Sequence, residues 1–163
     1  MEDFVTLLSS KEGDVYHITL SEDTILFSNE TVQLLGDLKV IGIDLRRLVG
    51  EAPTGHDMLA AIEKIVADFF LAHDNVMLFY YCDFINPIPH TSKKKMSPQE
   101  YRSNLFKRMF ERYLSHHDVD DVHLSVITAK GIDETFFFHL IYREEHAPLA
   151  PIISKDIKEG YSK

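Results

Sequence analysis

The chain has 163 residues, of which 45% are hydrophobic and 26% charged, and its formal net charge is −9. This length fits one domain and is sufficient to bury a core without disulfides or a metal. The single cysteine, Cys82, excludes a disulfide scaffold and a four-cysteine zinc site, and the net charge argues against a protein that wraps a long nucleic acid. We expect one α+β domain over 1–157 and a C-terminal tail at 158–163.

The N-terminal third has the composition of strands, with short runs of β-branched and aromatic residues separated by turn signals. The last of these runs is apolar on both of its alternating sides, which favours a well-buried strand. The segment 28–37 has no clear pattern. The predicted strands are 4–8, 15–20, 24–27 and 38–45.

Two helices have stronger signals. Apolar residues recur at helical spacing from Met58 to Phe69, which predicts a helix near 57–73. The second helix, near 97–116, begins with Ser97 at the N-cap, Pro98 at the first helical position and Glu100 two residues later.

Between these helices, the continuously apolar run 75–82 predicts a central strand that is buried on both faces. A hairpin of strands at 121–128 and 134–143 follows the second helix, and a short helix is expected near 152–157. The element order is therefore β-β-β-β-α-β-α-β-β, which indicates an α+β fold with a mainly antiparallel central sheet covered by two helices.

The sequence carries no targeting signal that we recognise. The first ten residues include Glu2 and Asp3 and lack a basic segment, and the longest apolar run, at 76–82, is too short to span a membrane. We expect a cytoplasmic protein with no membrane partner, because a single thiol needs no oxidising compartment.

Basic residues are concentrated between Lys93 and Arg112. This segment has a net charge of +5, which leaves −14 for the rest of the chain. One interpretation is a binding surface for a small anion or an acidic protein partner; the other is a solvated helix face and loop, neutralised in part by a Lys107–Glu111 pair. The residues of this basic cluster are Lys93, Lys94, Lys95, Arg102, Lys107, Arg108 and Arg112.

The hairpin suggests a metal site. If Thr128 pairs with Glu134, then His123 lies opposite His139, and a third ligand from another strand would complete a site. The alternative is two half-exposed histidines without a metal. Phe137 lies on the face opposite the expected core, so either a helix covers it or the hairpin edge forms a dimer interface.

Three segments resemble a family of small proteins, mostly from Bacteroidetes, that is grouped as a domain of unknown function. The similarity covers roughly 55–157 and departs most in the loop 84–96, and Met109 stands where that family typically has Trp. The resemblance implies a fold and carries no activity, substrate or site residue. The segments are Asn75–Asp83, which ends in Cys-Asp, Tyr101–Phe110, which resembles the family's Arg-Asn-x-x-Phe-x-x-Trp-Phe helix, and Glu134–Glu144.

A looser resemblance is to the GCN5-related N-acetyltransferases, on the segment Arg47-Leu48-Val49-Gly50-Glu51-Ala52 between a strand and a helix. Those enzymes use a strand, a Gln/Arg-x-x-Gly-x-Gly/Ala loop, a helix, a strand, a helix and a final hairpin. The resemblance implies coenzyme A binding at Arg47, Gly50 and Ala52 through backbone N–H groups and a helix N-terminus. It also implies Tyr113 as the acid, with Asn104 earlier in the same helix.

Two hypotheses of function follow. The first is a binding domain without a cofactor, which uses the basic cluster. The second is an acyltransferase that uses acetyl-coenzyme A. No catalytic motif in the sequence decides between them.

Overall fold

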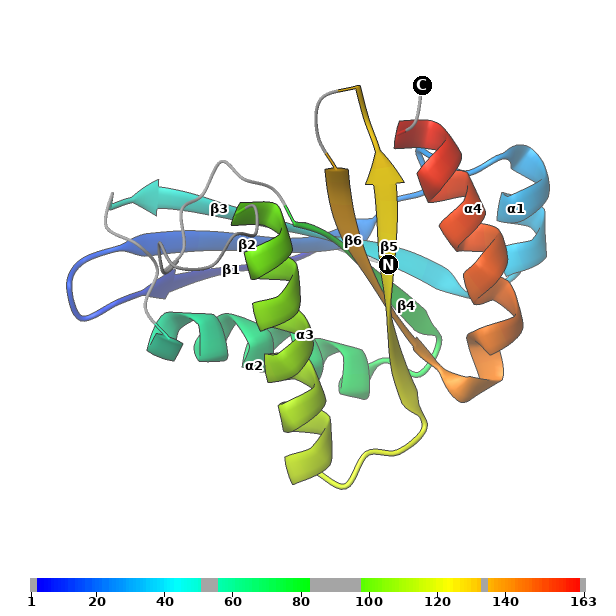
Figure 1. Cartoon of the computed structure of the whole chain (residues 1–163). Coiled ribbons are helices and arrows are strands. Elements are labelled where there is room, and N and C mark those ends of the chain that lie inside the picture. The colour runs from blue at the N-terminus through cyan, green and yellow to red at the C-terminus, as the bar shows by residue number, and fades with distance from the viewer. Residues whose placement is uncertain (1–2, 51–55, 83–97, 133–134, 162–163) are drawn as a thin grey trace.

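The structure is a computed structural model, and it describes residues 3–50, 56–82, 98–132 and 135–161. One mixed sheet runs through the molecule, with helices on both of its faces (Figure 1). The elements, in chain order, are β1 (Phe4–Ser9), β2 (Val15–Glu22), α1 (Asn29–Leu35), β3 (Lys39–Val49), α2 (His56–Ala72), β4 (Val76–Cys82), α3 (Pro98–His116), β5 (Val122–Lys130), β6 (Thr135–Arg143), the 3-10 helix η1 (Glu144–Leu149) and α4 (Ala150–Tyr161).

The sheet order is β1-β2-β3-β4-β6-β5. The α+β class is confirmed, but the expectation of a mainly antiparallel sheet is corrected to a mixed sheet, because β3 and β4 run parallel at its centre. The crossover through α2 makes this direction possible, since two parallel neighbours need a long connection that returns the chain to the same end of the sheet.

The element order also differs from the prediction between β2 and β3. The predicted strand at 24–27 is wrong: the Asp23 carboxylate accepts from the Ile25 N–H at 3.2 Å, and the Phe27 N–H donates to the Thr24 carbonyl at 3.0 Å, so this run is a turn. Ser28 then caps α1 by accepting from the Thr31 N–H at 3.1 Å.

Two hydrophobic cores form, one on each face of the sheet. On the α2/α3 face, Val66 and Phe110 pack against Ile18 and Leu78. On the α1/α4 face, Ile153 of α4 packs with Phe138, Leu140 and Met77. Residues Val76–Tyr80 of β4 are buried throughout because both faces of this strand are covered, which confirms the predicted central strand.

The helices α1 and α4 contact each other on the α1/α4 face. The Ser28 N–H donates to the Asp156 carboxylate at 3.0 Å, and Leu35 of α1 lies in the same core as Ile157 of α4. The helix expected near 152–157 is therefore confirmed and is longer, and it packs on the sheet, whereas only two covering helices were predicted.

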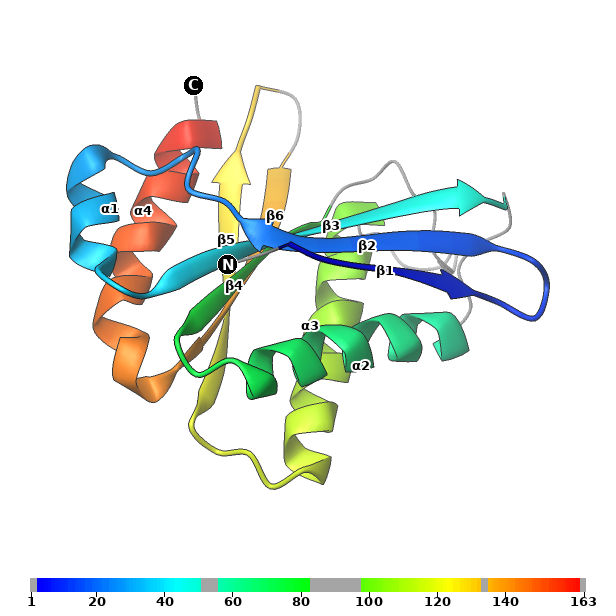
Figure 2. The same cartoon turned by 180° about the vertical axis from the view of Figure 1, so that it is seen from behind.

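The other half of the sheet is covered on one face only. We define the wing as β1, β2 and the part of β3 from Asp44 to Val49. In β2, buried residues alternate with half-buried ones because α2 covers one face of the wing, while the wing extends beyond α1 and α4 on the other (Figure 2). None of the described helices is both long and apolar enough to cross a membrane.

Candidate functional site at the divergence of β3 and β4

The parallel pair at the centre of the sheet separates part of the way along. The ladder joins Lys39–Ile43 to Val76–Tyr80 and ends at the pair Ile43–Tyr80. Beyond this point β3 continues to Val49, paired with β2, and β4 continues to Cys82, paired with β6. Six residues of β3, about 20 Å of strand, therefore have no partner on the β4 side among the described strands. The carboxyl ends of parallel strands where chain directions change are common ligand sites.

Arg47 and Gly50 lie at the β3 side of this divergence. The Arg47 guanidinium donates from Nε to the Tyr16 hydroxyl at 3.1 Å, and its carbon lies 5.1 Å from the centroid of the Tyr16 ring. Tyr16 is buried against α2, so Arg47 is held on the α2/α3 face.

Gly50 ends β3 with a φ of +109°, a backbone conformation that favours glycine. A Cβ at this position would also collide with the Asp14 carboxylate. The backbone conformation and the contact with Asp14 therefore explain why glycine stands at this position. Ala52, the third predicted cofactor residue, lies outside the described residues.

A buried polar pair lies on the β6 side. Ser103 Oγ of α3 and His139 Nε2 of β6 are hydrogen-bonded at 2.8 Å. Tyr80, the last β4 residue of the parallel ladder, is the cross-strand partner of His139. The Phe106 ring stacks on both, with centroid distances of 4.8 Å to Tyr80 and 4.9 Å to His139.

His139 is fully buried, and this burial, with the nearby charge of Lys107, lowers its pKa to about 4. The imidazole is therefore neutral at neutral pH. Ser103 was not predicted as a site residue, although it lies on the apolar stripe that includes Phe110 and Leu114, and a serine on such a stripe needs a buried partner.

The hairpin register that would bring His123 and His139 together as metal ligands is wrong. Thr128 pairs with Phe137, so His123 lies opposite Tyr142 and His139 lies opposite Val126. Because neighbouring residues of a strand alternate between faces, His123 and His139 point to opposite sides of the sheet.

His123 instead contacts the Glu144 carboxylate. No group of three or more His, Cys, Asp or Glu side chains suited to a metal occurs in the described part of the chain. Phe137, expected opposite the core, shares the α2/α3 face with His139 and is half-buried.

Tyr113, the predicted acid, lies away from the divergence. Its hydroxyl donates to the Asp68 carboxylate at 2.6 Å, and burial together with this bond raises the pKa of Tyr113 to about 12. It is ten residues after Ser103 on α3, about 15 Å along the helix axis. The expectation that Tyr113 belongs to a site near Gly50 is therefore corrected: Tyr113 joins α3 to α2.

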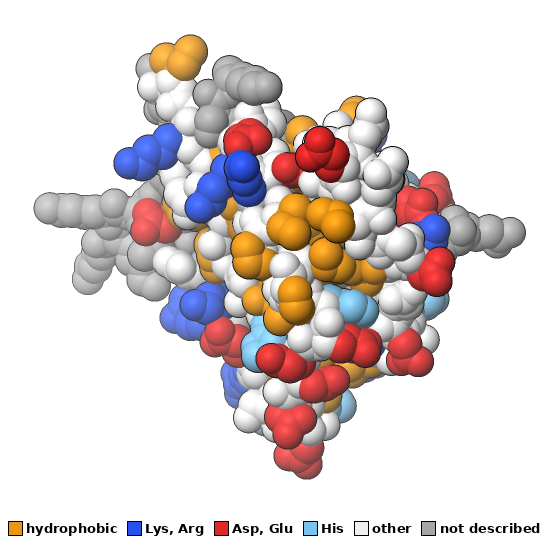
Figure 3. Space-filling model, turned by 90° about the vertical axis from the view of Figure 1, so that its right-hand side faces the viewer, with side chains coloured by type: hydrophobic (Ala, Val, Ile, Leu, Met, Phe, Trp, Pro, Cys, Tyr) orange, Lys and Arg blue, Asp and Glu red, His pale blue; other side chains and the backbone are white. Residues whose placement is uncertain are grey.

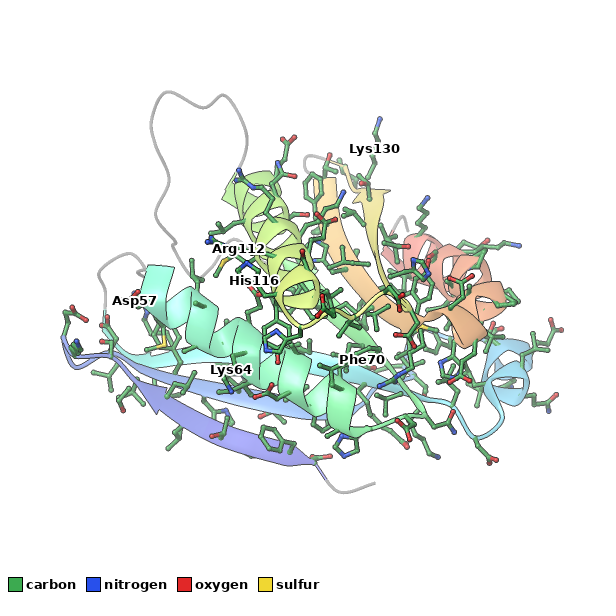
Figure 4. All side chains as sticks on the ribbon, turned by 90° about the horizontal axis from the view of Figure 1, so that it is seen from below. Asp57, Lys64, Phe70, Arg112, His116 and Lys130 are labelled. Carbon is green, nitrogen blue, oxygen red and sulfur yellow. The ribbon has the colours of Figure 1, made fainter. Side chains whose placement is uncertain are left out.

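The basic cluster is described only in part. Lys107 and Glu111 form the predicted pair at 4.0 Å, and Arg108 and Arg112 are exposed on α3. Arg112 and His116 lie on α3 beside α2 in the view of Figure 4. Lys93, Lys94 and Lys95 lie outside the described residues, and the Arg102 backbone belongs to α3 while its side chain is not described.

Charge is also segregated along α3. The loop after the helix, at its lower end in Figure 1, carries exposed Asp118, Asp120 and Asp121, and Figure 3 shows acidic side chains gathered at this end of the molecule. Arg112 lies in the last part of the helix, close to this acidic end, so among the described basic residues of α3 only Lys107 and Arg108 lie further from it.

One carboxyl group of α2, near Arg112 of the basic cluster, stands out. Glu63 is 6% exposed, and its Oε2 atom has no hydrogen-bond partner among the described residues. Burial raises the pKa of Glu63 to about 7, while the charge of Arg112 lowers it. Glu63 is therefore close to half protonated at neutral pH.

Comparisons with known proteins add no relationship: no family model matches the sequence, and no curated protein is significantly similar to it.

Proposed function

We propose that this chain binds an acyl-coenzyme A ligand where β3 and β4 separate, and that it is an acyltransferase of the GCN5-related type. The observation that carries the proposal is the end of the parallel ladder at Ile43–Tyr80 while both strands continue. Strands that separate expose backbone N–H and C=O groups along their facing edges, and an extended ligand with amide groups can pair with them.

The order of elements supports the same proposal. The sequence β3, loop, α2, β4, α3, hairpin follows the arrangement to which the segment Arg47–Ala52 was compared. In this proposal, the N-terminus of α2 supplies backbone N–H groups for a pyrophosphate. Two residues depart from the pattern: Glu51 adds a negative charge and Pro53 lacks an N–H.

Each side of the divergence has a distinct role in the proposal. Arg47 supplies positive charge to the phosphates, and Gly50 allows the chain to turn at the end of β3. Tyr80, with the Ser103–His139 pair next to it, forms the polar part of the opposite side. Tyr113 has no role, because its hydroxyl is bonded to Asp68 on the far part of α2.

Calorimetry with acetyl-coenzyme A tests this proposal, with two neighbouring arginines as a matched pair. Arg47→Gln removes the positive charge that Arg47 carries on the α2/α3 face. We expect the affinity for acetyl-coenzyme A to fall by about tenfold or more, as for the loss of a charged hydrogen bond. Arg46→Gln is the control, because Arg46 is exposed and pairs with Asp44 at 2.9 Å. Absence of binding at millimolar ligand, or equal losses in both variants, would contradict the proposal.

A second candidate function is the binding of an acidic protein through the basic cluster. It is favoured by the exposure of Arg108 and Arg112 on α3. Replacing Lys94, Arg102 and Arg108 by Glu should remove salt-sensitive partners from a pull-down. An unchanged set of partners would eliminate this candidate while leaving the coenzyme A proposal intact.

A further inference from the structure

β1 is an edge strand whose outer backbone groups have no strand partner in the described part of the chain. It is the terminal strand of the sheet, and among the described strands it pairs only with β2, through a regular antiparallel ladder from Phe4–Leu20 to Ser9–Val15. In Figure 4, no other described strand or helix lies on the outer side of β1.

The direction of these groups follows from the hairpin. The Ser10 N–H donates to the Asp14 carbonyl at 2.8 Å, and the Ser10 carbonyl accepts from the Gly13 N–H at 3.1 Å, so both groups of Ser10 face β2. Successive residues of a strand alternate in this respect. The backbone groups of Val5, Leu7 and Ser9 therefore point outward.

The side chains of β1 offer none of the usual protection of an edge strand. Such protection comes from lysine, proline or a bulge. The sequence of β1 is Phe-Val-Thr-Leu-Leu-Ser, without a charge or a proline, and its ladder with β2 has no register shift. Val5 and Leu7 are 55% and 59% exposed. The opposite edge, β5, includes His123 and Lys130, and α4 packs beside it.

We propose that β1 pairs antiparallel with β1 of a second copy of this chain, about a two-fold axis at Thr6, so that the two sheets become one. In this register, Val5 lies opposite Leu7 of the other copy and Phe4 lies opposite its Leu8. Thr6 lies opposite its own equivalent. All four apolar residues of β1 thus meet apolar partners.

The geometry of the strand agrees with this register. In an antiparallel pair, opposite residues share a face, so residues of like parity must pair. Val5 and Leu7 both have outward backbone groups, so they form hydrogen-bonded pairs on both sides of the axis. Asp3 lies opposite Ser9 of the second copy and diagonal to its Lys11, and the symmetry repeats this favourable charge pair. This self-complementarity favours a second copy over an unrelated extended peptide.

Sedimentation velocity of the full chain over about a hundredfold range of concentration tests the proposal. We expect a concentration-dependent dimer that Leu7→Lys converts to a monomer, with at least a tenfold rise in dissociation constant. Leu34→Lys is the matched control, because Leu34 lies on α1 and is similarly exposed, at 57%. A thermal melt of each variant separates loss of the dimer from loss of the fold.

Three results would overturn the proposal: a wild type that stays monomeric, a dimer that survives Leu7→Lys, or a Leu34→Lys variant that dissociates equally. A monomeric wild type that captures an extended apolar peptide at β1 would favour a peptide partner in place of a second copy.

Disulfide trapping tests the register in a Cys82→Ser background. Thr6 has inward backbone groups, so the two copies of this residue face each other in a close, non-hydrogen-bonded pair, within reach of a disulfide. We expect Thr6→Cys to form a covalent dimer on oxidation and Val32→Cys, on α1, to form none. A covalent dimer from Leu7→Cys but not from Thr6→Cys would place the axis at Leu7 and overturn the register proposed here.

Discussion

The two halves of the sheet bury their side chains differently. In the half formed by β4, β6 and β5, helices cover both faces, and Phe138 and Leu140 of β6 are fully buried on the α1/α4 side while His139 between them is fully buried on the other. In the wing, α2 covers one face, and exposed residues such as Leu48 remain on the strands. We expect the first half to be the more stable part of the molecule, whereas the wing contains the β1 edge and contributes only the β3 side of the proposed coenzyme A site.

The largest expected effect is in the doubly covered half. Phe138→Ala removes a fully buried ring and should lower the free energy of unfolding by about 3–5 kcal/mol, a large fraction of the stability of an ordinary domain. Leu48→Ala in the wing should change it by less than about 0.5 kcal/mol. Urea denaturation measures both, and similar losses would remove the distinction between the two halves.

Glu63, on the helix that covers the wing, should make stability depend on pH. Its pKa is raised in the folded state, so the folded protein binds the proton more tightly than the unfolded chain, and stability falls as pH rises from about 4.5 to about 7. Glu63→Gln should therefore be more stable than the wild type by on the order of 2–3 kcal/mol near pH 8, with no excess near pH 4.5.

The control for this effect is Glu111→Gln, an exposed carboxylate on α3. A Glu63→Gln variant that gains no stability at high pH would mean that solvent or an ion satisfies the Glu63 carboxylate. The buried carboxylate on the wing side would then have a hydrogen-bond partner, as the Ser103–His139 pair of the other half has.

Ser103→Ala tests the matched polar pair of the doubly covered half. The substitution leaves His139 without its 2.8 Å hydrogen bond, and we expect a loss of about 1–2 kcal/mol. Ser115→Ala, at an exposed position of the same helix, should be neutral within about 0.5 kcal/mol. Equal melting temperatures for the two variants would show that the pair adds no stability.

The smallest expected effect is at the contact between the two halves. Tyr113→Phe removes the hydrogen bond to Asp68 and should cost about 0.5–1 kcal/mol. Affinity for acetyl-coenzyme A should not change, because Tyr113 lies away from the divergence. A large loss of affinity in this variant would return Tyr113 to the ligand site.

The sequence predicted the parts of the fold that depend on local pattern. The continuous apolar run of β4 and the helix start at Pro98 were identified because burial on two faces and N-terminal capping leave direct traces in composition. The parallel direction of β3 and β4 was missed, because an apolar run has the same composition in either direction. The short α1 was missed because its cap, Ser28, follows a turn that has the composition of a strand.

The candidate site was predicted in part for a related reason. Gly50 is recognisable because a glycine between a strand and a helix marks a turn, whereas the partners of a buried side chain depend on register. The observed hairpin register differs from the predicted one by three residues, so the cross-strand partner of His139 is Val126 and not His123. The His139 side chain lies against α3, where it is hydrogen-bonded to Ser103. No spacing in the sequence relates Ser103 to His139, since helix and strand are brought together only by packing.

The place of α4 after all the strands of the sheet also bears on how the protein folds during synthesis. During synthesis the strands and the residues of the α2/α3 core are made first. Phe138 and Leu140 stay uncovered until Ile153 and Ile157 of α4, which follow later in the chain, can pack on them. Until then an apolar sheet face stays open to chaperones, proteases and other nascent chains. The bond from Ser28 to Asp156 joins an early segment to a late one, so this half of the molecule cannot be completed until α4 has been synthesised.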